Sequence, residues 1–520
     1  MIKQALISVS DKTGLLDFAK NLVEMEIKLI STGGTAKLLL NNNIPVIQIS
    51  DYTNFPEILS GRVKTLHPKI YGGILGRQNN KNDLETLILN EIPIIDLVIV
   101  NLYPFEKIIS QKKFSNNEAI ENIDIGGTSL LRAAAKNYEN VTVICNPSDY
   151  ANTLNEMKEN EKIVSLDTRL NLAKKVFSYT SSYDTNIFNY LNSINQNKKS
   201  DNNKIFPETL VIKLNKNQDL RYGENPHQLA SLYSSNFEKN NFFNYKQLQG
   251  KELSFNNLLD IDVAWNCVNS FEKEACVIVK HTNPCGVALA KTLKQAYLLA
   301  YETDPTSSFG SILAFNGNID EDVATEIVSK FVEIIVAPSF DSNALKIFSK
   351  KEKLRVMLIP NKLNNNKFDL KYVNGGFLLQ TSDSKKINFG DLKIVTKIKP
   401  NFQQMQDMLF SSIVAKFVKS NAIVFSKKGV TLGIGAGQTS RVDSVRIASQ
   451  KVQNFGKSLK GSVVASDAFF PFRDGLDEIV SSGAIAVVQP GGSIRDDEVI
   501  SAANEKNIIM AFTGVRNFKH

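Results

Sequence analysis

The stretch Ala275-Cys-Val-Ile-Val-Lys280-His281-Thr-Asn283-Pro284-Cys285-Gly286 joins an apolar run to several turn-forming residues. The first five residues are rich in β-branched types, which predicts a buried strand. The Asn-Pro pair and the glycine favour turns, so Lys280 and His281 are predicted to lie where a strand gives way to a loop. Ligands bind at that edge of open α/β sheets. The alternative is a structural pair, in which the lysine stem covers apolar surface and the histidine caps the strand.

Strand-like and helical patterns alternate on both sides of this stretch, which predicts an α/β protein with a parallel sheet and helices on both of its faces. Ala5 to Val9 and Leu97 to Val100, for example, alternate with the helical pattern of Leu15 to Met25. The polar run from Asn192 to Lys204 has no apolar periodicity and is typical of a linker. We therefore expect a first domain at residues 1–195, a linker at 196–204 and a second domain at 205–520, whose length predicts two subdomains.

The composition is that of a globular protein. Of the 520 residues 42% are hydrophobic and 22% are charged, and no apolar run approaches the ~18 residues of a membrane span. The net charge of +8 comes from lysines spread among asparagines, without a basic block interleaved with aromatic residues, which argues against nucleic acid as a partner. The charge fits either an enzyme of phosphorylated or carboxylated small molecules or a compositional bias.

The four cysteines lack CxxC spacing, which argues against a disulfide framework and against a thiolate metal site. The N-terminus enters a strand pattern directly and has no signal-peptide features. We expect a cytoplasmic protein with no membrane partner and no metal.

Two strand-to-helix junctions in the first region, Ser8 to Gly14 and Ser31 to Thr35, have the composition of an anion site. Free N–H groups and the positive helix end favour a phosphate there, and glycine permits close approach. Ordinary helix capping is the alternative for either junction alone, whereas two neighbouring junctions favour a shared pocket. Gly61 to Pro68 adds cations and a histidine, and Asp124 to Thr128 opens a helix on which Arg132 and Lys136 share a face.

The first region resembles the inosine monophosphate (IMP) cyclohydrolase domain of bifunctional purine biosynthesis enzymes. The matching motifs are Ser10-Asp-Lys-Thr-Gly14, Thr32-Gly-Gly-Thr35, Gly61-Arg-Val-Lys-Thr-Leu-His-Pro68, Asn101-Leu-Tyr-Pro-Phe105 and Asp124-Ile-Gly-Gly127. The resemblance implies a methylglyoxal-synthase-like fold that closes the purine ring of 5-formamidoimidazole-4-carboxamide ribonucleotide (FAICAR) to IMP with loss of water. It implies Lys136 as proton donor and acceptor, with Lys64, Tyr103 and Asp124 as further catalytic candidates. The implied nucleotide-binding residues are Ser10, Asp11, Lys12, Thr32, Gly33, Gly34, Thr35, Arg62, Val63, Lys64, Thr65, Val100, Asn101, Asp124 and Ile125.

The second region resembles the transformylase domain of the same bifunctional enzymes, which acts on aminoimidazole carboxamide ribonucleotide (AICAR). The matching motifs are Arg221-Tyr-Gly-Glu-Asn-Pro-His-Gln228, Lys280-His-Thr-Asn-Pro-Cys-Gly286, Asp304-Pro-Thr-Ser-Ser-Phe-Gly310, Ser420-Asn-Ala422, Gly433-Ile-Gly-Ala-Gly-Gln-Thr-Ser-Arg441, Ser466-Asp-Ala-Phe-Phe-Pro-Phe-Arg-Asp474 and Arg516-Asn-Phe-Lys-His520. The resemblance implies two cytidine-deaminase-like subdomains that transfer a formyl group from 10-formyltetrahydrofolate to the 5-amino group of AICAR. It also implies a homodimer.

Formyl transfer to a weakly nucleophilic aromatic amine needs a base and a group that stabilises the oxyanion. His281 suits the base, Lys280 suits the oxyanion or the proton of the leaving nitrogen, and Asn421 suits orientation of the formyl carbonyl. The resemblance assigns the AICAR site to Arg221, His281, Gly310, Glu333, Asn421, Arg441, Phe469 and Arg516, and the folate site to Val442 and Asp474. The aromatic residues between Phe469 and Phe472 fit a pocket wall or plain core.

Two local patterns are excluded as cofactor sites. Asn283 to Gly286 matches half of a zinc deaminase motif but has neither the second cysteine nor the preceding His-x-Glu. Gly433 to Gln438 has glutamine in place of the third glycine of the dinucleotide fingerprint. Two rivals to the bifunctional enzyme stay open: a relative with one activity, and a nucleotide-binding or sensing protein on the same fold.

Overall fold

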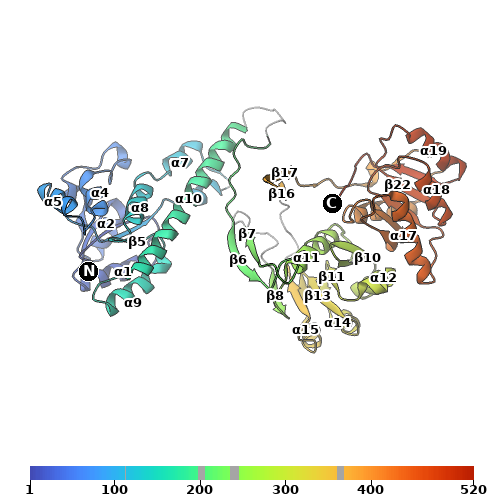
Figure 1. The fold of residues 1–520 in the computed structure, drawn as a ribbon, viewed down its shortest axis with the longest axis horizontal. Helices are drawn as coiled ribbons and strands as arrows, with labels where there is room; N and C mark the ends of the chain where they lie inside the picture. The colour runs from blue at the N-terminus through green and yellow to red at the C-terminus, as the bar shows by residue number, and fades with distance from the viewer. Residues whose placement is uncertain (112, 197–204, 235–244, 360–367) are drawn as a thin grey trace. The chain divides into compact units, whose positions relative to one another are not determined.

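The computed structural model describes residues 1–111, 113–196, 205–234, 245–359 and 368–520. It divides into two compact units, Met1–Lys213 and Leu214–His520 (Figure 1). Residues 205–213 therefore group with the first unit, whereas the sequence placed them in the second domain. Of the predicted linker only Gln196, the end of a helix, lies within the described residues.

The first unit is built on a five-stranded sheet in the order β3-β2-β1-β4-β5. All of its strand pairs are parallel, as the sequence predicted. Its strands are β1 (Gln4–Val9), β2 (Lys28–Ser31), β3 (Ile47–Gln48), β4 (Leu97–Asn101) and β5 (Thr142–Ile144). Its helices are α1 (Leu15–Glu24), α2 (Gly33–Asn41), α3 (Ile49–Thr53), η1 (Leu59–Gly61), α4 (Pro68–Leu75), α5 (Lys81–Leu89), α6 (Phe105–Ile109), α7 (Asn116–Glu121), α8 (Gly126–Lys136), η2 (Pro147–Asp149), α9 (Tyr150–Glu159) and α10 (Leu166–Gln196).

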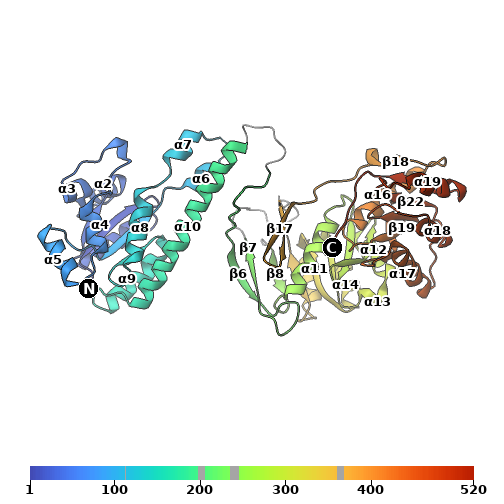
Figure 2. The same cartoon turned by 45° about the horizontal axis from the view of Figure 1, so that its top comes forward.

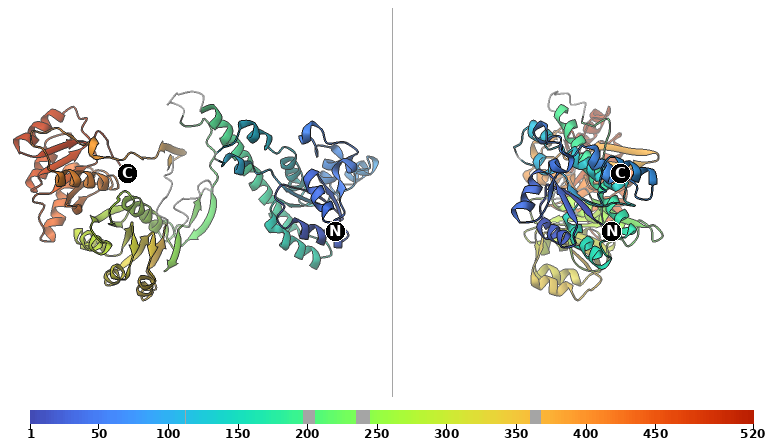
Figure 3. Two further views of the ribbon diagram at one scale, coloured as in Figure 1. Left: turned by 180° about the vertical axis from the view of Figure 1, so that it is seen from behind. Right: turned by 90° about the vertical axis from the view of Figure 1, so that its left-hand side faces the viewer.

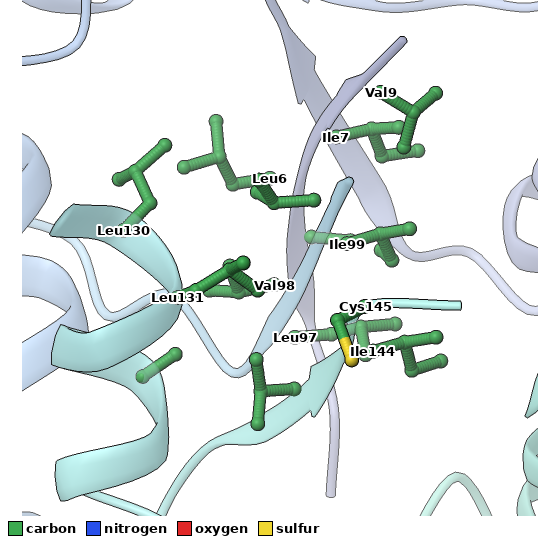
Figure 4. Close-up of a cluster of buried hydrophobic side chains, with 14 of the residues drawn as sticks. Leu6, Ile7, Val9, Leu97, Val98, Ile99, Leu130, Leu131, Ile144 and Cys145 are labelled. Carbon is green, nitrogen blue, oxygen red and sulfur yellow. The ribbon is translucent and has the colours of Figure 1, made fainter. Parts of the chain in front are cut away.

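The core of the first unit lies between this sheet and its helices. Every residue of β4 is buried, as expected for a parallel strand covered on both faces. Figure 4 shows Leu6 of β1 and Val98 of β4 on the side of the strands that faces Leu131 of α8, and Ile7 and Ile99 on the opposite side. The long helix α10 contacts α8 and β5 and is seen from behind in Figure 3. The strands whose carboxyl ends form one edge of the sheet are therefore held by a buried core.

The second unit is built on a twelve-stranded mixed sheet in the order β18-β23-β22-β21-β19-β20-β10-β9-β11-β13-β15-β8. Its strands are β8 (Lys246–Gln249), β9 (Ala275–Lys280), β10 (Asn283–Leu289), β11 (Ser311–Phe315), β13 (Val332–Ala337), β15 (Arg355–Leu358), β18 (Lys393–Ile394), β19 (Ile423–Lys427), β20 (Val430–Gly435), β21 (Val463–Ser466), β22 (Ala486–Gln489) and β23 (Ile509–Phe512). Three small pairs lie outside it: β6 (Asn215–Leu220) with β7 (Ala230–Ser234), β12 (Asn318–Ile319) with β14 (Ser339–Phe340), and β16 (Phe368–Val373) with β17 (Gly376–Thr381).

The helices of the second unit occupy the connections between these strands. They are α11 (Phe255–Val268), α12 (Leu293–Thr303), α13 (Pro305–Ser308), α14 (Glu321–Val328), α15 (Ser342–Phe348), η4 (Phe389–Asp391), α16 (Phe402–Ala415), α17 (Arg441–Asn454), α18 (Asp474–Ser481) and α19 (Asp496–Glu505). The strand predicted at Ala275 is present, and the apolar runs around Ile334, Val430, Val463 and Ala484 also form strands.

The large sheet is an internal repeat. In the first half β9 and β10 form a hairpin, β11 pairs antiparallel with β9, and β13 and β15 continue in parallel. In the second half β19 and β20 form a hairpin, β21 pairs antiparallel with β19, and β22 and β23 continue in parallel. The halves meet where β10 pairs antiparallel with β20. They run from green to yellow and from orange to red in Figure 2.

The opening stretch of the sequence folds differently from expectation in one respect. Asn283 to Gly286 belong to strand β10, and the loop predicted after Lys280 is a two-residue hairpin turn. Glycine is required in this strand because a Cβ on Gly286 would lie 2.0 Å from the Ala300 carbonyl oxygen of α12. The turn-forming residues therefore mark a close helix–strand approach and a bulge after Pro284 instead of a loop.

Candidate active sites

The predicted phosphate junctions of the first unit meet at the carboxyl ends of its strands. The Ser8 and Thr32 hydroxyl oxygens are 2.9 Å apart. Asn101, at the end of β4, accepts backbone N–H bonds from Ser10 at 2.5 Å and Asp11 at 2.8 Å. Three strand ends, β1, β2 and β4, thus contribute to one place, as expected where parallel strands share an edge.

The start of α2 has the form of an anion cradle. Thr32 occupies the N-cap position, but its side chain makes no capping hydrogen bond. Among the described residues the N–H groups of Gly33 and Gly34 have no acceptor, so they are free for an anion. Lys12 donates from Nζ to the Thr35 hydroxyl at 2.6 Å, and burial lowers the pKa of this lysine.

Lys64 and Asp124 lie at the same cradle. A Cβ on Gly33 would lie 3.8 Å from Lys64 Nζ, which pairs with Glu57 Oε1 at 3.3 Å. Asp124 accepts the Gly127 N–H at 2.7 Å and the backbone N–H of Tyr103. Burial raises the pKa of the Asp124 carboxyl, and the charge of Lys64 opposes that shift. A carboxyl beside an ammonium group is suited to hold or pass a proton.

Other predicted residues of this site are placed less directly. Thr65 is buried beside the start of α8, since a Cβ on Gly126 would lie 2.7 Å from its hydroxyl oxygen. Arg62 is exposed and forms an ion pair with Glu121. Val63 is half-buried and Ile125 is exposed. The Val100 side chain is buried in the core, so only its backbone is available to a ligand.

Lys136 is separated from this cradle within the chain. It is the last residue of α8, whose first residue, Gly126, lies beside Thr65. At 1.5 Å per residue the helix carries Lys136 about 15 Å from that end. Its side chain is exposed, and Lys64, Tyr103 and Asp124 are the catalytic candidates that the fold brings together.

Lys280 and His281 lie at the hairpin turn between β9 and β10. Lys280 Nζ donates to the Phe309 carbonyl oxygen at 2.8 Å, next to Gly310, which has φ of 69°. His281 and Thr282 are the two turn residues, with φ of 53° and 60°, and His281 is exposed. Positive φ at both positions defines a type I′ turn, which is strained for a β-branched residue such as Thr282.

Asn421 is connected to this turn through Asn283. The Asn283 carboxamide oxygen accepts the Lys419 N–H at 2.9 Å, two residues before Asn421. Asn421 itself is held by Gln438, whose carbonyl accepts the Asn421 N–H at 3.1 Å and its side-chain amide at 2.9 Å. The peptide bond before Asn421 is cis. The turn that carries Lys280 and His281 is thus bonded to the segment that leads into Asn421.

Two arginines predicted to grip a phosphate share an aromatic ring. The guanidinium carbons of Arg441 and Arg516 lie 5.9 Å and 4.5 Å from the centre of the Phe518 ring. Arg441 also donates to Ser466 Oγ at 3.2 Å and to Asp467 Oδ1 at 3.1 Å. Asp467 is fully buried, so its charge fixes Arg441 with its remaining donors free.

Glu333 and Arg221 both lie near Arg355. Glu333 Oε2 is 3.8 Å from Arg355 and 3.5 Å from the Asn257 amide nitrogen, and its charge acts on Asp260. Arg221 packs over Tyr222 and lies near Arg355. Phe469 is half-buried, Val442 and Asp474 occupy the first turns of α17 and α18, and none of these three has a contact in the described residues that joins it to His281. Phe470 is core, whereas Phe472 is exposed beneath Arg495.

Sequence reasoning missed Asp260 and Asp467. Asp260 accepts the Thr282 N–H at 2.6 Å, and burial raises its pKa while hydrogen bonds from the turn oppose the rise. The signal for Asp260 was a long-period repeat: Ser254-Phe-Asn-Asn-Leu-Leu-Asp260 matches Asn401-Phe-Gln-Gln-Met-Gln-Asp407, and both segments open with a capping box. Asp467 lies within the Ser466 to Asp474 motif, but that motif did not indicate its ion pair with Arg441.

The described residues contain no group of three or more His, Cys, Asp or Glu side chains arranged to hold a metal ion. None of the helices described is long and apolar enough to span a membrane. All four cysteines are buried free thiols.

The fold and the two clusters define a two-unit α/β enzyme. Comparison with protein families agrees: the model described as "AICARFT/IMPCHase bienzyme" matches residues 134–451, and the model described as "MGS-like domain" matches residues 14–129. The chain therefore belongs to the AICARFT/IMPCHase bienzyme family, the bifunctional enzymes of purine biosynthesis, as its motifs predicted. The predicted methylglyoxal-synthase-like first domain is confirmed as well.

A solved structure described as the crystal structure of ForH is similar to part of the chain. The two are 33% identical over 36% of this chain and 97% of that chain, with a TM-score of 0.33.

Proposed function

We propose that the chain catalyses two consecutive reactions: formyl transfer from 10-formyltetrahydrofolate to AICAR in the second unit, and dehydrative closure of FAICAR to IMP in the first. The observation that carries the proposal is the hydrogen bond that ties the turn of Lys280 and His281 to the segment leading into Asn421, in a member of this family. Mere binding of a nucleotide has no need of a proton-transfer group at each of two sites.

In the transfer step the 5-amino nitrogen of AICAR attacks the formyl carbon. His281 takes a proton from the attacking nitrogen, and Lys280 and Asn421 stabilise the oxyanion of the tetrahedral species. The bond from the formyl carbon to the folate nitrogen then breaks, and that nitrogen receives a proton to leave as tetrahydrofolate. Arg441 and Arg516 are suited to the ribonucleotide phosphate because both guanidinium groups converge on one ring.

In the closure step the carboxamide nitrogen of FAICAR attacks the formyl carbon. The formyl oxygen receives two protons and leaves as water. The free N–H groups at the start of α2 and the Lys12 ammonium would bind the phosphate. Lys64 and Asp124 stand closest to that cradle. Lys136, which the family motif nominates as proton donor and acceptor, stays a prediction.

Ultraviolet assays of each half-reaction on purified variants test the two-site proposal. Lys280→Ala or His281→Ala should stop formyl transfer and leave closure of supplied FAICAR intact, whereas Lys136→Ala should do the reverse. Loss of both activities in either class of variant, without unfolding, would contradict two separate sites. A wild-type chain with one activity would establish the single-activity rival, and one that binds nucleotide without turnover would establish the sensing rival.

The remaining expectations stay predictions of this proposal. They are a cytoplasmic homodimer, folate contacts at Val442 and Asp474, and activity without metal.

A further inference from the structure

The two hairpin turns of the repeated sheet have the same backbone geometry. His281 and Thr282 have φ of 53° and 60°, and Lys428 and Gly429 have φ of 54° and 73°. The lysine before each turn is also held in the same way: Lys280 Nζ donates to the Phe309 carbonyl at 2.8 Å, and Lys427 Nζ donates to the Lys460 carbonyl at 3.0 Å.

An aspartate on the preceding helix holds each turn. In the first half Asp260 of α11 accepts the Thr282 N–H at 2.6 Å and the backbone N–H of His281. In the second half Asp407 of α16 accepts the Gly429 and Lys428 N–H groups, each at 2.9 Å. The offset between the two aspartates equals that between Lys280 and Lys427, so the four residues are true structural counterparts.

The two halves differ in what the turn carries. The second position of the turn in the second half is occupied by Gly429, and glycine is the residue that tolerates positive φ best. The first half has Thr282 at the equivalent position, with His281 before it. Strain of this kind persists where the surroundings hold it and is concentrated at functional sites. Asp260 supplies that support and its charge also acts on the His281 imidazole.

Asp260 is the nearest acidic partner of the turn, although other charges surround it. Glu333 on β13 faces Asp260 and is paired with Arg355 on β15, near Arg221. Lys280 is turned toward the Phe309 carbonyl, and Lys419 contributes its backbone N–H to Asn283.

We propose that Asp260 is the positioning residue of His281: its carboxylate holds the turn that presents the imidazole and stabilises the imidazolium formed when His281 takes the proton of the substrate amine. The inference rests on the proposed formyl transfer. The proton moves from the amine nitrogen to the imidazole, and Asp260 stays ionised throughout.

The internal repeat supplies the matched control. Asp260→Asn and Asp407→Asn each remove one carboxylate that accepts two N–H bonds from a type I′ turn, but only the first turn carries His281. We expect Asp260→Asn to lower kcat of formyl transfer about 100-fold. Because the imidazolium loses a neighbouring negative charge, the acid limb of the kcat/KM profile should move to lower pH. Asp407→Asn should change neither.

A second pair of variants separates the charge from the backbone strain. Thr282→Gly copies the glycine of the second hairpin and relieves the strain, so the double variant Asp260→Asn/Thr282→Gly should fold even where Asp260→Asn alone does not. Compared with Thr282→Gly, the double variant should still show the lower kcat and the shifted acid limb. Thermal melts of every sample check that the second unit is folded.

Three results would overturn the inference: equal losses in Asp260→Asn and Asp407→Asn, full recovery of kcat by Thr282→Gly, or an acid limb that does not move. Absence of formyl transfer in the wild-type chain would instead overturn the proposed function.

Discussion

Asn283 accepts the backbone N–H of Lys419 at 2.9 Å and thereby ties the turn that carries His281 to the segment that leads into Asn421. The two residues belong to different halves of the repeated sheet, since Asn283 opens β10 and Lys419 precedes β19. The residues proposed for formyl transfer therefore lie where the halves meet.

Asn283→Ala should lower formyl transfer more than it lowers stability. The variant leaves the Lys419 N–H without its acceptor, which lowers the free energy of unfolding by about 1–3 kcal/mol. It also removes the bond that fixes the distance between the His281 turn and the segment of Asn421. A misplacement of about 1 Å between catalytic groups can lower the rate about 100-fold, so we expect kcat to fall by roughly 10- to 100-fold. Steady-state assays and thermal melts check this. An unchanged kcat would show that the bond does not set the geometry.

Much of the scaffold was predictable because it follows from hydrophobic pattern. The apolar run at Ala275 forms a strand as predicted, and the Ser8 and Thr32 junctions meet because parallel strands share an edge. The loop predicted at Asn283 was wrong because local turn propensity did not account for the approach of α12 to Gly286. Long-range pairing such as that of β10 with β20 has no local signal.

The site was predictable to a different extent. Motifs identified Lys280 and His281. Asp260 lies on helix α11, far from them in the sequence, and contacts the backbone of the turn, so only the long-period repeat marks it. Lys136 shows the converse: its motif is clear, yet the helix carries it away from the cradle. A sequence pattern names the residue type that a reaction needs, whereas the position of the side chain depends on packing.

The buried thiols should make the protein less stable above pH 9. Burial raises the pKa of Cys145 from 9.0 to about 11 and those of Cys267 and Cys285 to about 12. Each folded-state pKa is above the unfolded value, so the stabilisation is fully present below pH 9 and is lost as the pH rises toward the folded value. Between pH 9 and 10 the slope should approach about 1.4 kcal/mol per pH unit for each thiol.

Denaturant unfolding at several pH values measures that slope, and Cys285→Ala should reduce it. Folded protein at pH 8 should resist iodoacetamide at all four cysteines, because only the thiolate reacts. Rapid labelling of the native chain would contradict the burial of these thiols.

Gly286→Ala should destabilise the second unit. The new Cβ would lie 2.0 Å from the Ala300 carbonyl oxygen, a backbone atom that cannot rotate away. Overpacking of this kind costs about 1–3 kcal/mol or more. Gly390→Ala is the matched control, since no atom lies within 4 Å of its Cβ position. Chemical denaturation of both variants checks the difference, and equal stability would argue against close contact of α12 with β10.

Glu57→Gln should strengthen nucleotide binding in the first unit. Glu57 Oε1 lies 3.3 Å from Lys64 Nζ and neutralises a cation that the phosphate cradle would otherwise offer to substrate. The pair is partly exposed, so it is worth at most about 1 kcal/mol, which corresponds to a KM for FAICAR lower by up to about fivefold. Lys64→Met should raise that KM. In the double variant the benefit of Glu57→Gln should vanish, because the carboxylate acts only through Lys64. If Glu57→Gln lowers KM equally with and without Lys64, the carboxylate repels the substrate directly and Lys64 is not the cation that binds it.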